Sequence, residues 1–139
     1  MRIVLISMIA LMTSFSGSAQ KFNLKVVIED IEKSKGIIYM SLHDKADGYP
    51  SDEEKAVRTA QIKDFGSQAE FTFENLDQGE YAVSVFQDLN GNTEMDTNFF
   101  GFPQEPVGAS NMTSLGRPNF SKCKFKLDKN STISVQYMN

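Results

Sequence analysis

The sequence predicts an all-β fold, a single seven-stranded antiparallel β-sandwich with one long irregular loop. Three observations predict it. Apolar and polar residues alternate in short segments, polar turns rich in Gly, Asn and Asp separate these segments, and no stretch carries the apolar period of a long helix. Since an antiparallel sheet needs only one buried face, two such sheets can enclose a core. A closed barrel is the alternative arrangement.

Short segments along the whole chain carry the strand signal. In the clearest of them, Phe71 and Phe73 alternate with polar neighbours. Residues 37–43 are apolar on both phases, as a central strand is. A capping pattern at residues 51–54 predicts a short helical turn before the third strand, with a helix over residues 53–60 as the other option. The predicted strands are residues 22–31, 37–43, 57–63, 69–75, 81–87, 122–127 and 132–137.

The start of the chain has the layout of a secretory signal peptide. Arg2 precedes an apolar stretch of roughly ten residues, which is too short to span a bilayer that needs about 20. Small residues at positions 17–19 then offer a cleavage site. We therefore predict that residues 1–19 are removed and that residues 20–139 form a single domain outside the cytoplasm, secreted or periplasmic. No segment is expected to insert into a membrane after cleavage.

The charge of the chain and its cysteine content exclude some classes of partner and one source of stability. The net charge of −4 becomes one unit more negative once Arg2 is removed, which argues against nucleic acid and anionic lipid surfaces as partners. Cys123 is the only cysteine, so the chain cannot form an internal disulfide. This cysteine shares the apolar phase of Phe125 and Leu127, and it is predicted to be a buried core thiol.

An oxygen-rich loop follows the strand predicted at residues 81–87. Its acidic and amide side chains fall at alternate positions, as in a loop that coils around a hard cation such as Ca²⁺. Thr93 and Phe99 depart from the helix-flanked calcium loop, which has glycine and a bidentate glutamate at these places. The alternative is an Asx-rich turn whose side chains bind their own backbone, and the sequence leaves both open. The predicted metal ligands are Asp88, Asn90, Asn92, Glu94 and Asp96.

A second stretch, residues 97–121, is rich in phenylalanine, proline and glycine and has no clear strand signal. Irregular loops of this length in a compact domain are usually functional or disordered, and the aromatic residues favour order. One interpretation is a lid that buries the aromatic side chains against one end of the sandwich. The other is a ligand-binding surface. Its candidate contact residues are Phe99, Phe100, Phe102, Glu105, Asn111 and Arg117.

No catalytic motif is present in the sequence. His43 is the only histidine and is expected at the surface, because no serine elbow, CxxC or HExxH pattern accompanies it. We therefore expect a non-catalytic binding or structural module, with Ca²⁺ as its candidate cofactor and a protein or carbohydrate of the cell envelope as its ligand. One alternative is an envelope-associated hydrolase acting on carbohydrate or peptide, with a site among His43, Asp88 and Glu105. Another is an adhesion or assembly subunit.

An ordered series of motifs runs through the second half of the chain, at residues 79–83, 88–92, 96–98, 101–106, 108, 110–111 and 116–120. This series resembles the DUF2141 family of secreted bacterial proteins. The resemblance covers essentially the whole chain after residue 19, and it implies an extracytoplasmic bacterial protein without assigning an activity. The Gly79-Glu80-Tyr81 phrase before a strand also resembles transthyretin-like and carboxypeptidase-regulatory-like modules, which implies an immunoglobulin-like or transthyretin-like sandwich.

Four positions depart from the pattern that is usual in that family. Gln87 stands where the family has histidine, and Thr93 stands where it has glycine. Val107 and Ala109 stand where the family has aromatic residues. These departures argue against a metal role for residue 87 and against a stacking surface at residues 107–109. They leave Asp88, Asn90, Asn92 and Asp96 as the family has them.

Overall fold

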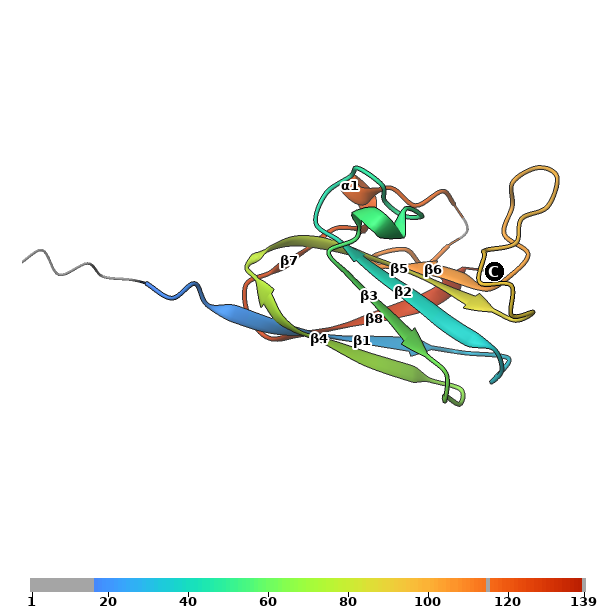
Figure 1. Ribbon diagram of the computed structural model, residues 1–139, viewed down its shortest axis with the longest axis horizontal. Helices are drawn as coiled ribbons and strands as arrows, with labels where there is room; N and C mark the ends of the chain where they lie inside the picture. The colour runs from blue at the N-terminus through green and yellow to red at the C-terminus, as the bar shows by residue number, and fades with distance from the viewer. Residues whose placement is uncertain (1–16, 115, 139) are drawn as a thin grey trace, which may run out of the picture.

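The part of the chain that the structure describes forms one 8-stranded sheet, which curls into a nearly closed barrel (Figure 1). The structure is a computed structural model and describes residues 17–114 and 116–138, so most of the predicted signal peptide, residues 1–16, lies outside the described residues. In the described part of the chain, no helix is long and apolar enough to cross a membrane. The elements are β1 (Lys21–Glu29), β2 (Ile37–His43), η1 (Glu53–Lys55), β3 (Arg58–Ile62), β4 (Ala69–Asp77), β5 (Gly79–Asp88), β6 (Val107–Ala109), α1 (Phe120–Cys123), β7 (Phe125–Leu127) and β8 (Ser131–Met138).

The strands follow one another around the barrel in the order β3-β2-β5-β6-β8-β1-β4, and β7 pairs with the first residues of β5. Neighbouring strands are antiparallel except β1 and β8, which run parallel. The all-β prediction is confirmed. The seven-stranded antiparallel sandwich is wrong in its strand count, in the direction of one strand pair and in its degree of closure. The barrel that the sequence leaves as the alternative is closer to the fold.

The strand that the sequence does not predict, β6, explains the closure. It pairs with β5 through all its residues and with β8 through Val107 and Gly108, so it joins what would otherwise be two separate sheets. So short a strand cannot show a clear alternation in the sequence. A Cβ at Gly108 would lie 2.7 Å from the carbonyl oxygen of Gln136 and 2.9 Å from Val135 Cγ1. Glycine therefore lets β6 approach β8 closely.

The strand predicted at residues 122–127 is only partly correct. Its first residues belong to α1, where Asn119 caps the helix by accepting a hydrogen bond from Lys122 N at 3.0 Å. The strand β7 forms only the end of the predicted segment. The short helical turn expected before β3 is confirmed as η1, with Asp52 as its N-cap residue.

The main core lies inside the barrel, between the inward-facing side chains of its strands. Leu24, Val26 and Ile28 of β1 are fully buried there, which confirms the phase predicted from the sequence. A smaller buried cluster lies on the outer side of the sheet, where α1 packs near β5 and β6. It contains Cys123, which is buried as predicted. Removal of these apolar side chains from water is the main favourable contribution to folding.

The turn between β1 and β2 is fastened to the end of β5. Gln87 Nε2 donates hydrogen bonds to the carbonyl oxygens of Lys33 and Lys35, at 2.6 and 2.7 Å. Gly36 has a φ of +79°, and a Cβ added to it would lie 2.0 Å from the carbonyl oxygen of Asp88. Residue 36 must therefore be glycine, both for its backbone angle and for the space that it leaves.

We expect Gly36→Ala to lower the free energy of unfolding by about 2–4 kcal/mol, because the new Cβ meets the Asp88 carbonyl group and the residue keeps a positive φ. Gly91→Ala is the matched control. Gly91 also has a positive φ, +80°, but no atom of the described residues lies within 4 Å of an added Cβ, so a loss of only about 1–2 kcal/mol is expected. Urea unfolding measures both variants. Equal losses would contradict a special role for the close approach at residue 36.

Candidate functional site: the Asp88 loop and the aromatic hairpin

Asp88 is the last residue of β5 and the anchor of the loop that follows; it is 1% exposed. Its Oδ1 accepts hydrogen bonds from Asn90 N at 3.2 Å and Gly91 N at 2.7 Å, and its Oδ2 accepts one from Thr93 N at 2.9 Å. Burial raises the pKa of Asp88, but the backbone N–H donors outweigh this effect and hold the pKa below its usual value. The side chain is therefore an ionised acceptor around which the loop folds.

Asp96 closes the outer side of the same loop. Its Oδ1 accepts a hydrogen bond from Asn92 Nδ2 at 2.9 Å, and its Oδ2 accepts one from Asn90 Nδ2. The side-chain oxygens of these two asparagines accept the backbone N–H groups of Asn92 and Glu94, each at 3.0 Å. Glu94 is exposed and joins the network through its backbone. The predicted metal ligands thus come together in the Asx-turn arrangement that is the alternative to a cation site.

A bound Ca²⁺ would need several of these oxygen atoms to face one centre. Among the residues that the structure describes, no three His, Cys, Asp or Glu side chains gather as ligands of one metal ion. Both carboxylate oxygens of Asp88 and both of Asp96 already accept N–H groups. Calcium binding at this loop stays a prediction, and it requires the ion to replace amide N–H donors at Asp96.

Glu105 holds the two ends of the loop together. It is 8% exposed, and its Oε1 accepts a hydrogen bond from Leu89 N at 2.8 Å while its Oε2 accepts one from Asp96 N at 3.4 Å. The next residue, Pro106, accepts a hydrogen bond from Gln87 N at 2.9 Å and leads directly into β6. The sequence marks Glu105 as a candidate ligand contact, whereas in the structure its buried carboxylate supports the loop through hydrogen bonds.

Residues 96–104 form a hairpin, which we call the aromatic hairpin. Asn98 N donates a hydrogen bond to Phe102 O at 2.8 Å, and the apex turn is closed by Gly101 N, which donates to Asn98 O at 2.9 Å. Asn98 Oδ1 also accepts the N–H groups of Phe100 at 2.9 Å and Phe102 at 3.0 Å. Asn98 is not among the candidate residues predicted from the sequence, although an asparagine shortly before a glycine is a turn signal. Hydrogen bonds, rather than burial, order this hairpin.

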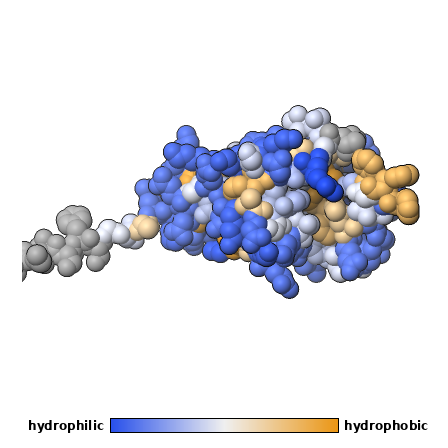
Figure 2. All heavy atoms as spheres, turned by 90° about the horizontal axis from the view of Figure 1, so that it is seen from above, coloured by the Kyte–Doolittle hydropathy of each residue, from blue (hydrophilic) through white to orange (hydrophobic). Residues whose placement is uncertain are grey.

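The phenylalanines of the aromatic hairpin point into solvent. Phe99 is 97% exposed, Phe100 79% and Phe102 56%. Apolar surface gathers at one end of the molecule in Figure 2, which is the end where Figure 1 places the hairpin. The interpretation as a lid that buries these rings is therefore wrong. The apex turn explains the difference, because Phe99 and Phe100 are its two central residues. The segment that carries this turn projects from the barrel in Figure 1.

The two remaining candidate contact residues lie in the segment between β6 and α1. Asn111 has a φ of 60°, and its Nδ2 donates a hydrogen bond to Lys124 O at 2.8 Å. This bond fastens the segment to the end of α1, so Asn111 belongs to the scaffold. Arg117 is exposed.

His43 is buried, so its expected position at the surface is wrong. It is 0% exposed, and its Nε2 lies 3.1 Å from the carbonyl oxygen of Asp52. Its Nδ1 has no hydrogen-bond partner among the residues that the structure describes. Tyr49 packs edge-on against the imidazole ring. The loop after β2 folds back over the strand end and is held there by Tyr49, whose hydroxyl donates to Val83 O at 3.0 Å.

His43 also lies far from the two carboxylates of the candidate hydrolase site. In the pairing of β2 with β5, His43 is opposite Ala82, whereas Asp88 is opposite Ile37. These positions are at opposite ends of the strand pair, about 20 Å apart at the usual rise per residue. The structure therefore brings Asp88 and Glu105 together at one loop and does not bring His43 to them.

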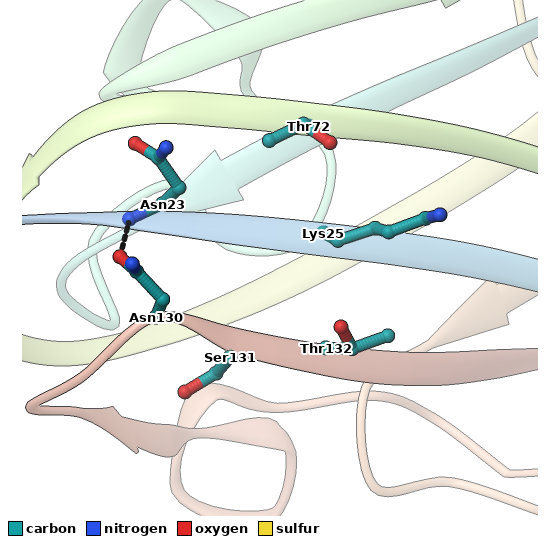
Figure 3. A pocket seen from close by; sticks show the side chains of 6 residues that line it. All are labelled: Asn23, Lys25, Thr72, Asn130, Ser131 and Thr132. Atoms are coloured by element: carbon teal, nitrogen blue, oxygen red, sulfur yellow. Dashed lines mark hydrogen bonds between the residues drawn. The ribbon is translucent and has the colours of Figure 1, made fainter.

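Two surface depressions lie away from the loop and the hairpin. One, of about 270 Å³, lies on the outer face of β4, β1 and β8 (Figure 3), where Asn130 Oδ1 accepts a hydrogen bond from Asn23 N at 2.9 Å. The other, of about 390 Å³, lies beside the turn between β4 and β5. Neither is lined by a residue that the sequence marks as functional. The residues around the first are Asn23, Lys25, Thr72, Asn130, Ser131 and Thr132.

Comparison with known proteins supports the resemblance found in the sequence. The family model described as an uncharacterized protein conserved in bacteria, DUF2141, matches residues 26–135. No curated protein and no solved structure matches. The matched range includes the whole Asp88 loop and the whole aromatic hairpin.

We expect Asp88→Asn to lower the free energy of unfolding at neutral pH by about 1–3 kcal/mol, because an amide nitrogen cannot accept the N–H groups that the carboxylate accepts. The folded-state pKa of Asp88 is depressed, so its contribution is present above the unfolded-state pKa of about 3.9 and is lost as the pH falls through the folded-state value. The stability gap between wild type and variant should therefore close below about pH 4.

Urea unfolding across this acidic range measures the gap. Asp64→Asn, in an exposed turn, is the control and should change stability by less than about 0.5 kcal/mol. A gap for Asp88→Asn that stays constant down to the lowest pH would show that the carboxylate charge does not hold the loop.

Proposed function

Given that the chain belongs to the DUF2141 family of proteins conserved in bacteria, we propose that it is an exported, non-catalytic binding module whose contact surface is the aromatic hairpin. The observation that carries the proposal is the exposure of Phe99 (97%), Phe100 (79%) and Phe102 (56%) on a hydrogen-bonded turn. Exposed apolar patches on folded proteins commonly mark interaction sites. A purely structural module has no need for three exposed aromatic rings at one end.

The support beneath the hairpin also favours a binding role. Asp88 and Glu105 accept backbone N–H groups from both ends of the loop that carries the hairpin. A surface that is already ordered loses little conformational entropy when it binds a ligand. The hairpin therefore combines the exposure and the order that a recognition element requires.

Export is part of the proposal and rests on the sequence of residues 1–19. Their basic residue, apolar stretch and small residues have the layout of a signal peptide. The ligand is then a component of the cell envelope. If that component is another protein, the chain acts as an adhesion or assembly subunit. The hydrolase alternative has less support, because His43 and Asp88 lie at opposite ends of the β2–β5 pair.

We expect the purified protein to sediment with bacterial cell envelopes and Phe99→Ser/Phe100→Ser to lower the bound fraction at least about tenfold, since burial of each ring contributes about 1.5–3 kcal/mol. The double variant should keep the wild-type melting temperature, because both rings are exposed in the free protein. Gln104→Ser, an exposed polar substitution on the same hairpin, is the control and should bind like wild type. Equal binding of wild type and the double variant would remove the hairpin as the contact surface.

Calcium at the Asp88 loop is the second part of the proposal. We expect Ca²⁺ to bind with a Kd of about 10⁻⁴–10⁻³ M, in the range of extracellular modules, and to raise the melting temperature. At about ten times the Kd, the stabilisation is about 1.4 kcal/mol. Asp96→Asn should abolish the rise, because its carboxylate is the group at which the ion replaces amide donors. Mg²⁺ at the same concentration controls for ionic strength. If calorimetric titration of the wild type with Ca²⁺ shows no heat of binding and the melting temperature does not change, the site is excluded.

A further inference from the structure

The aromatic hairpin carries an uncharged apex above an acidic base. Residues 97–104 contain no charged side chain, and Glu94 and Asp96 precede them directly. Between Asp88 and Arg117 the chain has no lysine or arginine. An anionic surface would repel the two carboxylates at the base of the hairpin, whereas an electrically neutral and apolar environment would accept the apex.

The exposed apex is small and convex. The exposed fractions of Phe99, Phe100 and Phe102 together equal somewhat more than two whole phenylalanine side chains, or roughly 350–600 Å² at about 150–250 Å² each. A standard protein interface buries about 800 Å² on each partner. The hairpin projects from the barrel in Figure 1, so a protein partner would need a pocket to receive it. A lipid bilayer needs no such pocket.

Three backbone N–H groups of the apex are already hydrogen-bonded within the hairpin. The N–H groups of Phe100, Gly101 and Phe102 all donate to oxygen atoms of Asn98. An unpaired backbone N–H group in hydrocarbon costs several kcal/mol, and these three groups avoid that cost without any partner from the lipid. The apex thus presents apolar side chains, and the N–H groups of Phe100, Gly101 and Phe102 are paired within the hairpin.

We propose that the aromatic hairpin inserts shallowly into the interface of an electrically neutral lipid bilayer. Phe99 and Phe100 enter the boundary between headgroups and acyl chains, about 5–10 Å deep, as other interfacial anchors do. The acidic residues at the base remain in water. The contact is peripheral, with no segment crossing the bilayer, but it departs from the expectation from the sequence that no segment inserts into a membrane after cleavage. This inference rests on the proposed binding role and names the class of ligand for the same surface.

Tryptophan fluorescence tests the proposal, because the sequence contains 0 tryptophan residues. Phe99→Trp places a single probe at the apex, and Thr72→Trp, on the exposed outer face of β4, is the matched control. With vesicles of phosphatidylcholine and phosphatidylethanolamine, the emission of Phe99→Trp shifts to the blue and resists quenching by acrylamide, while that of Thr72→Trp stays unchanged. Replacement of part of the neutral lipid by phosphatidylglycerol weakens binding, most strongly at low salt.

Vesicle sedimentation separates the role of apolar side chains from that of the backbone. Phe99→Ser/Phe100→Ser lowers the partition coefficient at least about tenfold, and Phe99→Leu/Phe100→Leu keeps most of it because leucine is also apolar. The melting temperatures of these variants confirm that each is folded.

Three results would overturn the proposal: no spectral change with neutral vesicles, an equal change in the Thr72→Trp control, or a preference for anionic vesicles. Sedimentation with whole envelopes distinguishes this failure from failure of the binding role. If envelopes retain the wild type through the hairpin although neutral vesicles do not, the ligand is a protein or a carbohydrate and the binding role stands. If envelopes also fail to retain it, both proposals fall.

Discussion

The pairing of β6 with β5 on one side and with β8 on the other is the contact on which the rest of the structure depends. It joins β3, β2 and β5 to β8, β1 and β4 in one sheet. It also fixes where the chain returns to the barrel after the hairpin, because Gln87 N donates to Pro106 O directly before β6 begins. Gly108 permits the pairing, since a side chain there would meet the Gln136 carbonyl group. The same strand pairings therefore determine both the closure of the barrel and the position of the hairpin.

The long strands could be predicted from the sequence because alternation is a local property of each segment. Residues 69–75 were recoverable in this way, since apolar residues alternate there with exposed polar ones. Residues 37–43 were recoverable because they are apolar on both phases, as a central strand is. β6 could not be predicted, because its strand character comes from partners that are distant in the sequence. The apolar residues around Cys123 suit a strand as well as a helical turn, and the Asn119 cap decides between them. The parallel pairing of β1 with β8 joins the two ends of the domain and leaves no local signal.

The residues of the candidate site could be predicted from the sequence. Whether their side-chain oxygens face a cation or accept backbone N–H groups could not. Carboxylate and amide oxygens can face a cation or accept N–H groups, so residue type alone does not separate the two. The turn through Gly91 and Thr93, both with positive φ, brings N–H groups to Asp88 and decides the observed arrangement. Hydrophobicity likewise predicts burial of Phe99, but its exposure depends on the hydrogen bonds of Asn98. The burial of His43 depends on a loop that folds back from elsewhere.

The two ends of the described chain lie at different distances from the aromatic hairpin. Residues 17–20 leave the barrel at the end opposite the hairpin (Figure 1). Met138, at the end of β8, instead pairs with Val107, shortly after the hairpin returns to the sheet. A protein immobilised through the end of β8 therefore turns the aromatic apex toward the support, whereas one held through the residue just before β1 presents the apex to the solution. The point of attachment decides whether a sensor surface or a fusion tag leaves the hairpin accessible.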